Sequence, residues 1–387
     1  MRVFLSCLVC RIVTFVLHKL GRGATSMPGK VALKVKRNVL KDLSENTKVI
    51  VVTGTNGKTT SCRILEEGLK KAGKSYFINK SGANLITGVT ASFIMNSTIT
   101  GKCKKDYAII ECDENAFKEV SRYIHCDVIL VTNVFRDQLD RYGEVTHTLN
   151  AIKESVKNLP NAIVCLDADC SLTYSMSKEI PNKIITFGVN VPFDKNAKAP
   201  EISDAKYCIF CKHEYDYTYH TYGHLGGFVC PNCGYKRPQP DFAVESVEEM
   251  KNDHSVVVAN LNGDRNIIRV NIGGAYNIYN AIGCAAALTA FGIDEKTVID
   301  AIEHFNGAFG RMEHFKAGDN TVNLILVKNP AGFSQTMNFL KNIDDDFTLI
   351  LSLNDNAADG RDISWIWDVD FAGIFEKANV KEIYVTG

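Results

Sequence analysis

The stretch "VVTGTNGKTT", residues 51–60, carries the residue types best suited to binding phosphate. A phosphate-binding loop commonly reads G-x-x-x-x-G-K-[ST], whereas here only two residues separate Gly54 from Gly57. Backbone N–H groups at the start of a helix can surround phosphate oxygens, Lys58 can neutralise their charge, and the Thr59 hydroxyl can reach Mg²⁺. The alternative is a glycine-rich turn that binds nothing. The candidate nucleotide contacts are Thr55, Asn56, Gly57, Lys58, Thr59 and Thr60.

The segments on either side of this loop must position it. Lys48–Val52 is a short β-branched run, which predicts a buried strand. Between Thr59 and Ala72, apolar residues recur at helical spacing, and Gly73 is placed to end the helix. The order strand, glycine loop, helix is the context that a phosphate site requires.

Two further strands are predicted to end in polar residues. Tyr107–Ile110 leads into Glu111, whose carboxylate would face the crevice at the carboxyl edge of a parallel sheet and bind Mg²⁺. The alternative is a solvated acid at a strand end. Residues 127–131 lead into "TNVFRDQLDRYGE", a loop consistent with either catalytic residues or an ion-paired surface.

Four cysteines have the spacing of a metal site. Cys208, Cys211, Cys230 and Cys233 form two C-x2-C pairs, which allow four thiolates to bind one Zn²⁺ in a closed, structural site. The aromatic-rich segment between the pairs predicts a short hairpin, and the alternative is buried free cysteines. Thirteen cysteines in 387 residues are too few for a disulfide scaffold, so we expect reduced thiols. Cys7 and Cys10 are expected to pack in a core.

Composition restricts the partners. Lysines and arginines number 44, as do aspartates and glutamates, so no global field favours nucleic acid. The N-terminal apolar runs resemble a signal peptide, but Arg11 interrupts them and no clear cleavage site follows. The segment therefore predicts an apolar helix that either packs on the domain or lies along a membrane surface, and not a membrane span.

The chain resembles the Mur ligase superfamily, which comprises the ATP-dependent peptide-bond formers of peptidoglycan assembly and their folate relatives. The resemblance covers essentially the whole chain. It is carried by "GTNGKTT", "AIIECDE", "TNVFRDQLD", "GAYNIYNAIGCAAA" and "GRMEHF", in this order. The segments "TSMPGK", "VKNPAGF" and "LNDNAADGRDISWIWDVDF" are similar to the MurT-type synthetase subunits of lipid II isoglutaminyl synthase.

This resemblance implies ATP-dependent amidation. The γ-phosphate passes to the α-carboxyl of D-glutamate in the lipid II stem peptide, and ammonia displaces phosphate to give D-isoglutamine. It also implies a GatD-type glutaminase as heterodimer partner. This agrees with the sequence, in which no cysteine lies in a recognisable glutaminase motif. ATP, Mg²⁺ and structural Zn²⁺ are the expected cofactors. We expect a cytoplasmic protein that meets lipid II at the inner face of the membrane and binds no nucleic acid.

Site residues follow from the matched motifs. Lys58, Thr59 and Thr60 match the phosphate loop, and Glu111 matches the glutamate that coordinates Mg²⁺. By the same matching, Asn277 and Asn280 lie near the nucleotide base and Arg311 contacts the γ-phosphate, although an arginine in its position is often a surface ion pair. Asp362 would orient the Cys–His pair of the partner, with Asp359 and Asp355 as the next candidates for this role. The alternative is a loop that caps a helix at Ser364.

Two departures separate the chain from ligases that add amino acids. A histidine-containing segment is replaced by one with Gln138 and Tyr142, and "AHNP" is replaced by "VKNP" at 327–330. Both point away from a second metal ion and from amino-acid docking. The rival functions are nevertheless an amino-acid-adding Mur or folylpolyglutamate-type ligase and, in another class, a zinc-ribbon P-loop protein that binds nucleic acid.

The predicted fold is α/β. Residues 1–46 form an N-terminal helix and connecting segment, and residues 47–312 form a P-loop, Mur-ligase-type domain with a zinc ribbon inserted at about 205–240. Residues 313–387 form a Rossmann-like C-terminal domain. Relatives continue beyond "EIYVTG", so we expect this last domain to be incomplete.

Overall fold

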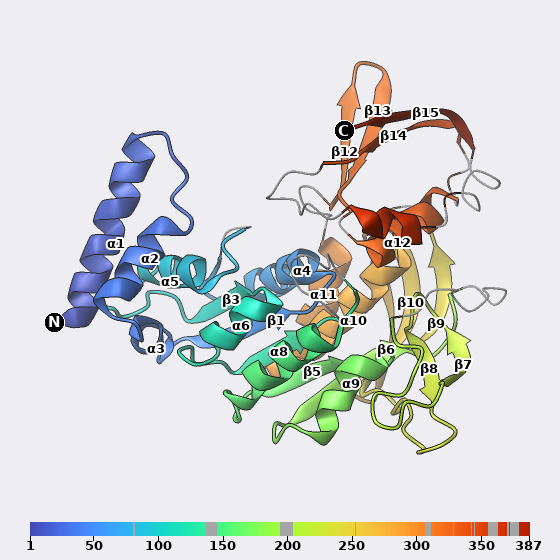
Figure 1. The fold of residues 1–387 in the computed structure, drawn as a ribbon, viewed down its shortest axis with the longest axis horizontal. Coiled ribbons are helices and arrows are strands. Elements are labelled where there is room, and N and C mark those ends of the chain that lie inside the picture. The colour runs from blue at the N-terminus through green and yellow to red at the C-terminus, as the bar shows by residue number, and fades with distance from the viewer. Residues whose placement is uncertain are drawn as a thin grey trace.

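A nine-stranded sheet forms the centre of the protein (Figure 1). The computed structural model describes residues 1–79, 82–136, 145–193, 204–251, 253–305, 311–327, 329–341, 343, 345–354, 363–369, 371 and 379–387. The strands of the sheet are β1 (Lys48–Thr53), β2 (Tyr76–Ile78), β3 (Tyr107–Glu111), β4 (Val128–Val131), β5 (Ile163–Asp167), β6 (Ile184–Val189), β9 (Phe242–Met250), β10 (Ser255–Leu261) and β11 (Asp264–Val270).

The strand order is β11-β10-β9-β6-β5-β4-β1-β3-β2. Pairing is parallel from β2 to β9 and antiparallel among β9, β10 and β11. Because β1 lies between β3 and β4, its residues from Val49 to Thr53 are all buried, which explains its uninterrupted apolar run. The predicted α/β class and the three predicted strands in this region are confirmed. The antiparallel edge was not predicted.

The helices divide into groups that pack with each other or with the sheet. They are α1 (Arg2–Lys19), α2 (Met27–Val35), α3 (Val39–Ser44), α4 (Lys58–Lys71), α5 (Ile86–Met95), α6 (Glu114–Val120), α8 (Val145–Lys157), α9 (Ser171–Ser175), α10 (Ala275–Ala290), α11 (Glu295–His304) and α12 (Pro330–Leu340). Helices α4, α10 and α11 contact each other, and all three also contact strands of the sheet. Helices α1, α2, α3 and α5 form a separate group at the N-terminal end (Figure 1).

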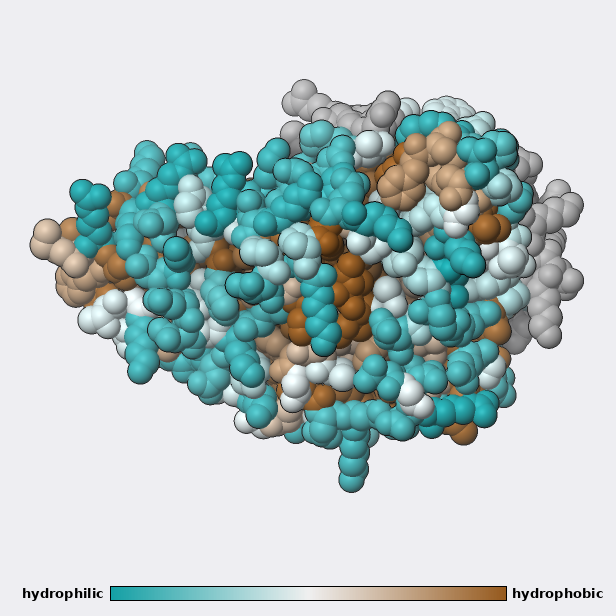
Figure 2. Space-filling model, turned by 90° about the horizontal axis from the view of Figure 1, so that it is seen from below, coloured by the Kyte–Doolittle hydropathy of each residue, from teal (hydrophilic) through white to brown (hydrophobic). Residues whose placement is uncertain are grey.

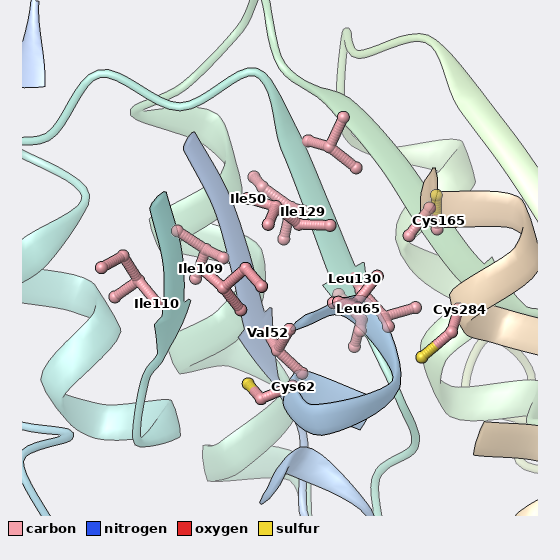
Figure 3. Close-up of a cluster of buried hydrophobic side chains, with 14 of the residues drawn as sticks. Ile50, Val52, Cys62, Leu65, Ile109, Ile110, Ile129, Leu130, Cys165 and Cys284 are labelled. Carbon is pink, nitrogen blue, oxygen red and sulfur yellow. The ribbon is translucent and has the colours of Figure 1, made fainter. Parts of the chain in front are cut away.

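One part of the core lies between the sheet and helix α4. Ile50, Ile109 and Ile129 project from three adjacent strands, while Leu65 and Cys62 come from α4 (Figure 3). The predicted apolar stripe of α4 is confirmed, and burying a leucine of this kind contributes about 2 kcal/mol to folding. This packing fixes the first turn of α4, and therefore the predicted phosphate loop, against the end of β1.

The N-terminal group of helices confirms the expected packing of two cysteines. Cys7 and Cys10 are fully buried where α1 meets its neighbours, as expected for core packing. All thirteen cysteines belong to the described part of the chain and are free thiols. Among the described helices, none combines the length and the apolar character that crossing a membrane would demand.

The C-terminal residues form smaller elements. Strands β12 (Arg311–Ala317) and β13 (Asn320–Ile325) make a hairpin, and β14 (Phe347–Ser352) pairs in parallel with β15 (Val380–Thr386). The predicted boundary at 312/313 falls inside β12, and the division into domains stays a prediction.

Candidate phosphate-binding site and metal centre

The loop between β1 and α4 requires glycine at position 57. Gly57 has a φ of 85°, in the left-handed region that side chains disfavour. A Cβ atom there would lie 2.1 Å from Oδ1 of Asn280 on α10. Asn280 cannot easily move aside, because its side chain is buried and its Nδ2 donates to Asn277 Oδ1 at 2.9 Å. The compressed glycine spacing therefore lets the loop lie directly on α10.

Two buried asparagines hold Asn56, the residue before this glycine. Asn133, which follows β4, accepts from the Asn56 N–H at 3.0 Å and donates to its carbonyl at 3.2 Å. Asn329, which precedes α12, donates through Nδ2 to Asn56 Oδ1 at 2.9 Å. The Oδ1 atom of Asn329 also accepts from Gly332 N at 2.8 Å and so caps α12. The C-terminal region thus contacts the loop directly.

Neither Asn133 nor Asn329 was among the predicted site residues. The available signals were local: an asparagine just after a predicted strand, and an Asn-Pro pair of the kind that opens a helix. Neither signal indicates which distant residue the side chain will contact.

Lys58 lies across the loop that precedes it. Its Nζ donates to the carbonyl oxygens of Gly54 at 2.5 Å and Thr55 at 3.3 Å, and it forms an ion pair with Glu114 Oε1 at 3.0 Å. Both charged side chains are largely buried. These contacts keep the Lys58 ammonium beside the backbone N–H groups of the helix start, where a phosphate would bind.

The two side chains predicted to bind Mg²⁺ are adjacent. Thr59 Oγ1 in the first turn of α4 donates to Glu111 Oε1 at the end of β3, at 3.1 Å. The backbone of Glu111 is fixed by Asn79, which accepts from its N–H at 2.8 Å and donates to its carbonyl at 2.9 Å. A hydroxyl and a carboxylate are the hard oxygen donors that Mg²⁺ prefers, so this pair fits the ion. Asn79 was not predicted.

The other predicted loop threonines point inward. The Thr55 hydroxyl donates to the carbonyl of Phe135 and accepts from its N–H, both at 3.1 Å, so it ties the loop to the segment after β4. Thr60 is 9% exposed within α4. The Thr55 side chain therefore supports the loop, and contact of either threonine with a nucleotide stays a prediction.

The remaining predicted residues have different outcomes. Asn280 on α10 lies against Gly57 of the loop and hydrogen-bonds to Asn277 on the same helix, and the role of both residues near the base stays a prediction. Arg311 opens β12 and pairs with Ile325, but its side chain is outside the described part of the structure. Asp362 also lies outside the described residues. Arg136, from the polar loop after β4, forms an ion pair with Asp368 at 2.5 Å.

The four ribbon cysteines occupy two matching turns. In one turn the N–H of Lys212 donates to the carbonyl of Cys208 at 2.9 Å, and in the other that of Gly234 donates to Cys230 at 3.0 Å. Lys212 and Gly234 both have a left-handed φ, 63° and 74°. Between the turns, β7 (Asp216–His220) and β8 (Gly226–Val229) form the predicted hairpin.

The cysteine sulfurs are arranged to hold a zinc ion. All four sulfurs of Cys208, Cys211, Cys230 and Cys233 lie within 4.8 Å of one another. Tetrahedral zinc–thiolate geometry separates sulfurs by about 3.8 Å, so small shifts would close the site. Hydrogen bonds from the Asn232 side chain and the His213 backbone lower the pKa of Cys211 to about 6, which favours the thiolate that a metal needs. Although the Tyr235 backbone acts to lower it, hydrogen bonds with the other three ribbon thiols raise the pKa of Cys233 to about 12, so metal binding there must displace a proton.

The ribbon also supports the phosphate loop. The Tyr222 ring stacks on the Phe135 ring with centroids 5.6 Å apart, and the Thr55 hydroxyl hydrogen-bonds to the backbone of Phe135. Thr221 shares a hydrogen bond of 2.8 Å with the hydroxyl of Tyr279, which neighbours Asn280 on α10. The turn between β7 and β8 of the ribbon therefore contacts both supports of the loop.

We expect Gly57→Ala to weaken the binding of MgATP by about tenfold or more, because the backbone strain costs about 1–3 kcal/mol and the new Cβ displaces Asn280. The matched control is Gly292→Ala, whose φ of 86° is the same but whose Cβ meets open space. Titration calorimetry and thermal unfolding compare the two. Equal ATP affinity in both variants would show that the Asn280 contact is unimportant.

Asn329→Asp, studied at pH 8, should weaken MgATP binding by about tenfold while leaving α12 capped, because an oxygen replaces the Nδ2 donor that faces Asn56. Asn329→Ala removes the cap as well and should lower thermal stability by about a further 1 kcal/mol. ATP affinity in Asn329→Asp equal to that of the wild type would refute a role for this contact.

Metal removal should affect both stability and nucleotide binding. The purified protein should contain one zinc per chain by elemental analysis, and Cys233→Ser should lose it with a drop of several kcal/mol in unfolding free energy. Loss of the ribbon should also weaken ATP binding through Tyr222 and Phe135. Cys103→Ser, outside the ribbon, is the control. Metal-free protein with full stability would contradict the assignment.

The chain is similar to known proteins both in sequence and in fold. Residues 52–225 match the family model described as Mur ligase middle domain, and residues 326–387 match that of MurT ligase C-terminal. The fold is similar to a pseudomurein peptide ligase type C from Methanothermus fervidus, with a TM-score of 0.66 at 23% identity over 88% of this chain and 67% of that one. It is also similar to MurF ligase from Thermotoga maritima in complex with ADP, with a TM-score of 0.60 at 14% identity over 93% and 74% of the two chains.

Two curated relatives have the same description, lipid II isoglutaminyl synthase (glutamine-hydrolyzing) subunit MurT. The one from Streptococcus pneumoniae is 36% identical over 100% of this chain and 84% of its own length. The one from Staphylococcus aureus strain N315 is 33% identical over 95% of this chain and 81% of its own length. The chain therefore belongs to the MurT family of Mur ligases.

Proposed function

We propose that this protein uses ATP to convert the α-carboxyl of D-glutamate in the lipid II stem peptide into an amide, with ammonia supplied by a GatD-type glutaminase partner. Membership of the family makes the chain an ATP-dependent ligase. The observation that carries the proposal is the phosphate loop, where Lys58 and the Thr59–Glu111 pair meet at the carboxyl edge of the sheet. The proposed substrate is supported by two relatives described as subunits of lipid II isoglutaminyl synthase.

The chemistry needs two displacements. A carboxylate oxygen attacks the γ-phosphorus, and the bond to the β-phosphate oxygen breaks, which gives an acyl phosphate and ADP. Ammonia then attacks the acyl carbon, phosphate leaves with the bonding electron pair, and the nitrogen releases a proton to solvent. Such a sequence depends mainly on positioning and charge neutralisation, because the phosphate groups carry the charge that must be stabilised.

Residues of this chain would meet these needs as follows. Lys58 and the N–H groups of the α4 start bind the β- and γ-phosphates, and Arg311 is the proposed contact of the γ-phosphate. Thr59 and Glu111 would hold Mg²⁺, which neutralises phosphate charge when bound. Asn277 and Asn280 are proposed to lie near the base. In the structure they hydrogen-bond to each other, and Asn280 also faces Gly57 of the loop.

The cysteines support an external source of ammonia. Of the nine cysteines outside the ribbon, eight are buried: Cys7, Cys10, Cys62, Cys112, Cys126, Cys165, Cys170 and Cys284. Burial raises the pKa of each of these thiols, so none is an accessible thiolate of the kind that attacks glutamine. We therefore assign glutamine hydrolysis to the partner, with Asp362 as the proposed acid that orients its Cys–His pair.

The proposed setting follows from the substrate. A lipid-linked acceptor places the reaction at the cytoplasmic face of the membrane, where ATP is available. ATP, Mg²⁺ and a structural Zn²⁺ in the ribbon are the proposed cofactors.

The decisive assay combines the chain with a glutaminase subunit, glutamine, MgATP and a lipid II analogue. We expect ADP release and a product that mass spectrometry identifies by replacement of a hydroxyl with an amino group. Ammonium chloride should replace the partner and glutamine. Lys58→Ala should lower the rate by about a hundredfold or more, because a phosphate-binding cation is lost.

Lys70→Ala is the matched control, since Lys70 lies on the exposed end of the same helix, paired with Glu67. It should retain the wild-type rate. ADP release that depends on a specific amino acid instead of ammonia would assign the chain to the amino-acid-adding ligases. Wild-type activity of Lys58→Ala would reject the phosphate-loop mechanism.

A further inference from the structure

Several large apolar side chains of helix α1 point away from the protein interior, which is unusual for a helix on the surface of a protein. The residues that it buries are small or polar: Ser6, Cys7, Cys10 and Thr14. Both hydroxyls are satisfied inside the protein, since Ser6 donates to Ala32 O at 3.0 Å and Thr14 to Cys10 O at 2.8 Å. An amphipathic helix on a soluble protein normally buries its large apolar residues and exposes its polar ones. On α1 the fully buried residues are all small, and several large apolar residues are exposed instead.

The outward face of α1 consists of large apolar side chains. Phe15 is 61% exposed, Ile12 51% and Val16 47%. At 3.6 residues per turn they lie on one side of the helix. The full set of exposed apolar residues on α1 and its end is Phe4, Leu5, Ile12, Phe15, Val16 and Leu20. Figure 2 shows apolar surface at the end of the molecule where Figure 1 places α1.

The surrounding charge is positive. Residues 1–41 contain nine lysines and arginines and no aspartate or glutamate. Two of the nine are paired with acids outside this segment, Lys36 with Asp42 and Arg37 with Glu119, which leaves an excess of positive charge beside α1. Arg2 and Lys19 lie on the outward side of α1, and Arg22 follows its end. Arg11 has a different role, because its guanidinium donates to the carbonyls of Ile94 and Ser97 at the end of α5 and holds α1 in place.

We propose that the outward face of α1, with its flanking basic residues, docks the protein onto an anionic lipid bilayer. A helix that is apolar outward and basic at its ends lies in the plane of the headgroups, with its apolar side chains inserted and its cations on the lipid phosphates. A second copy of the chain is a poorer occupant, because it would bring two strongly basic segments together. Docking leaves the rest of the molecule in water.

The test uses the full chain with vesicles that contain no lipid II and no nucleotide, so its result is independent of the proposed ligase activity. The wild type should sediment with vesicles of phosphatidylglycerol and phosphatidylcholine but poorly with phosphatidylcholine alone, and salt should weaken the binding. The double variant Ile12→Glu, Phe15→Glu should lower the affinity by more than about tenfold. Lys19→Gln and Arg22→Gln should each lower it by about fivefold.

The matched control is Ile267→Glu on β11, because Ile267 is 70% exposed and lies outside α1. It should bind vesicles like the wild type, and all variants should unfold at the wild-type temperature. Failure of the wild type to bind anionic vesicles overturns the proposal, as does an equal loss in Ile267→Glu. A dimer in analytical ultracentrifugation that the double α1 variant abolishes would instead make this face a self-association surface and overturn lipid docking.

Discussion

The arrangement of the site depends on how the backbone at Asn56 and Gly57 is held. Gly57 turns left-handed against Asn280, and Asn56 is bonded by Asn133 and Asn329. These partners belong to different parts of the chain, so the loop keeps its shape only when the sheet, α10 and the C-terminal region are all assembled. Local sequence preference alone would leave such a turn loose, because glycine loses more conformational entropy on folding than any other residue.

Buried charge connects the ribbon to the same loop. Asp169 Oδ1 accepts from Arg237 Nε at 2.5 Å, and its other oxygen accepts from the Tyr279 hydroxyl at 2.5 Å. Burial raises the pKa of Asp169 although Arg237 acts in the opposite direction. Losing one partner of a buried pair is more costly than the pair itself is stabilising, because a desolvated charge remains. Tyr279 precedes Asn280 on α10, so its bond to the Asp169–Arg237 pair also helps to position α10 against Gly57.

The sequence predicted what depends on neighbouring residues. The strand–loop–helix unit and the two C-x2-C turns were identified because each is encoded within a short stretch. The contacts of Asn79, Asn133 and Asn329 were not predicted, since a lone asparagine carries no information about its distant partner. The exposure of the large apolar residues of α1 was also not predicted, because an apolar run alone does not reveal which side of the helix faces the protein.

The ribbon lies within the connection between two adjacent parallel strands, β6 and β9. Such strands are commonly joined by a helix that covers the sheet, whereas this connection includes the β7–β8 hairpin and the cysteine turns. Bringing together the ends of so long a segment has an entropic cost that grows with its length. A metal ion that cross-links Cys208 to Cys233 would shorten the effective loop. Zinc availability would then influence how readily the antiparallel edge of the sheet joins its parallel half during folding.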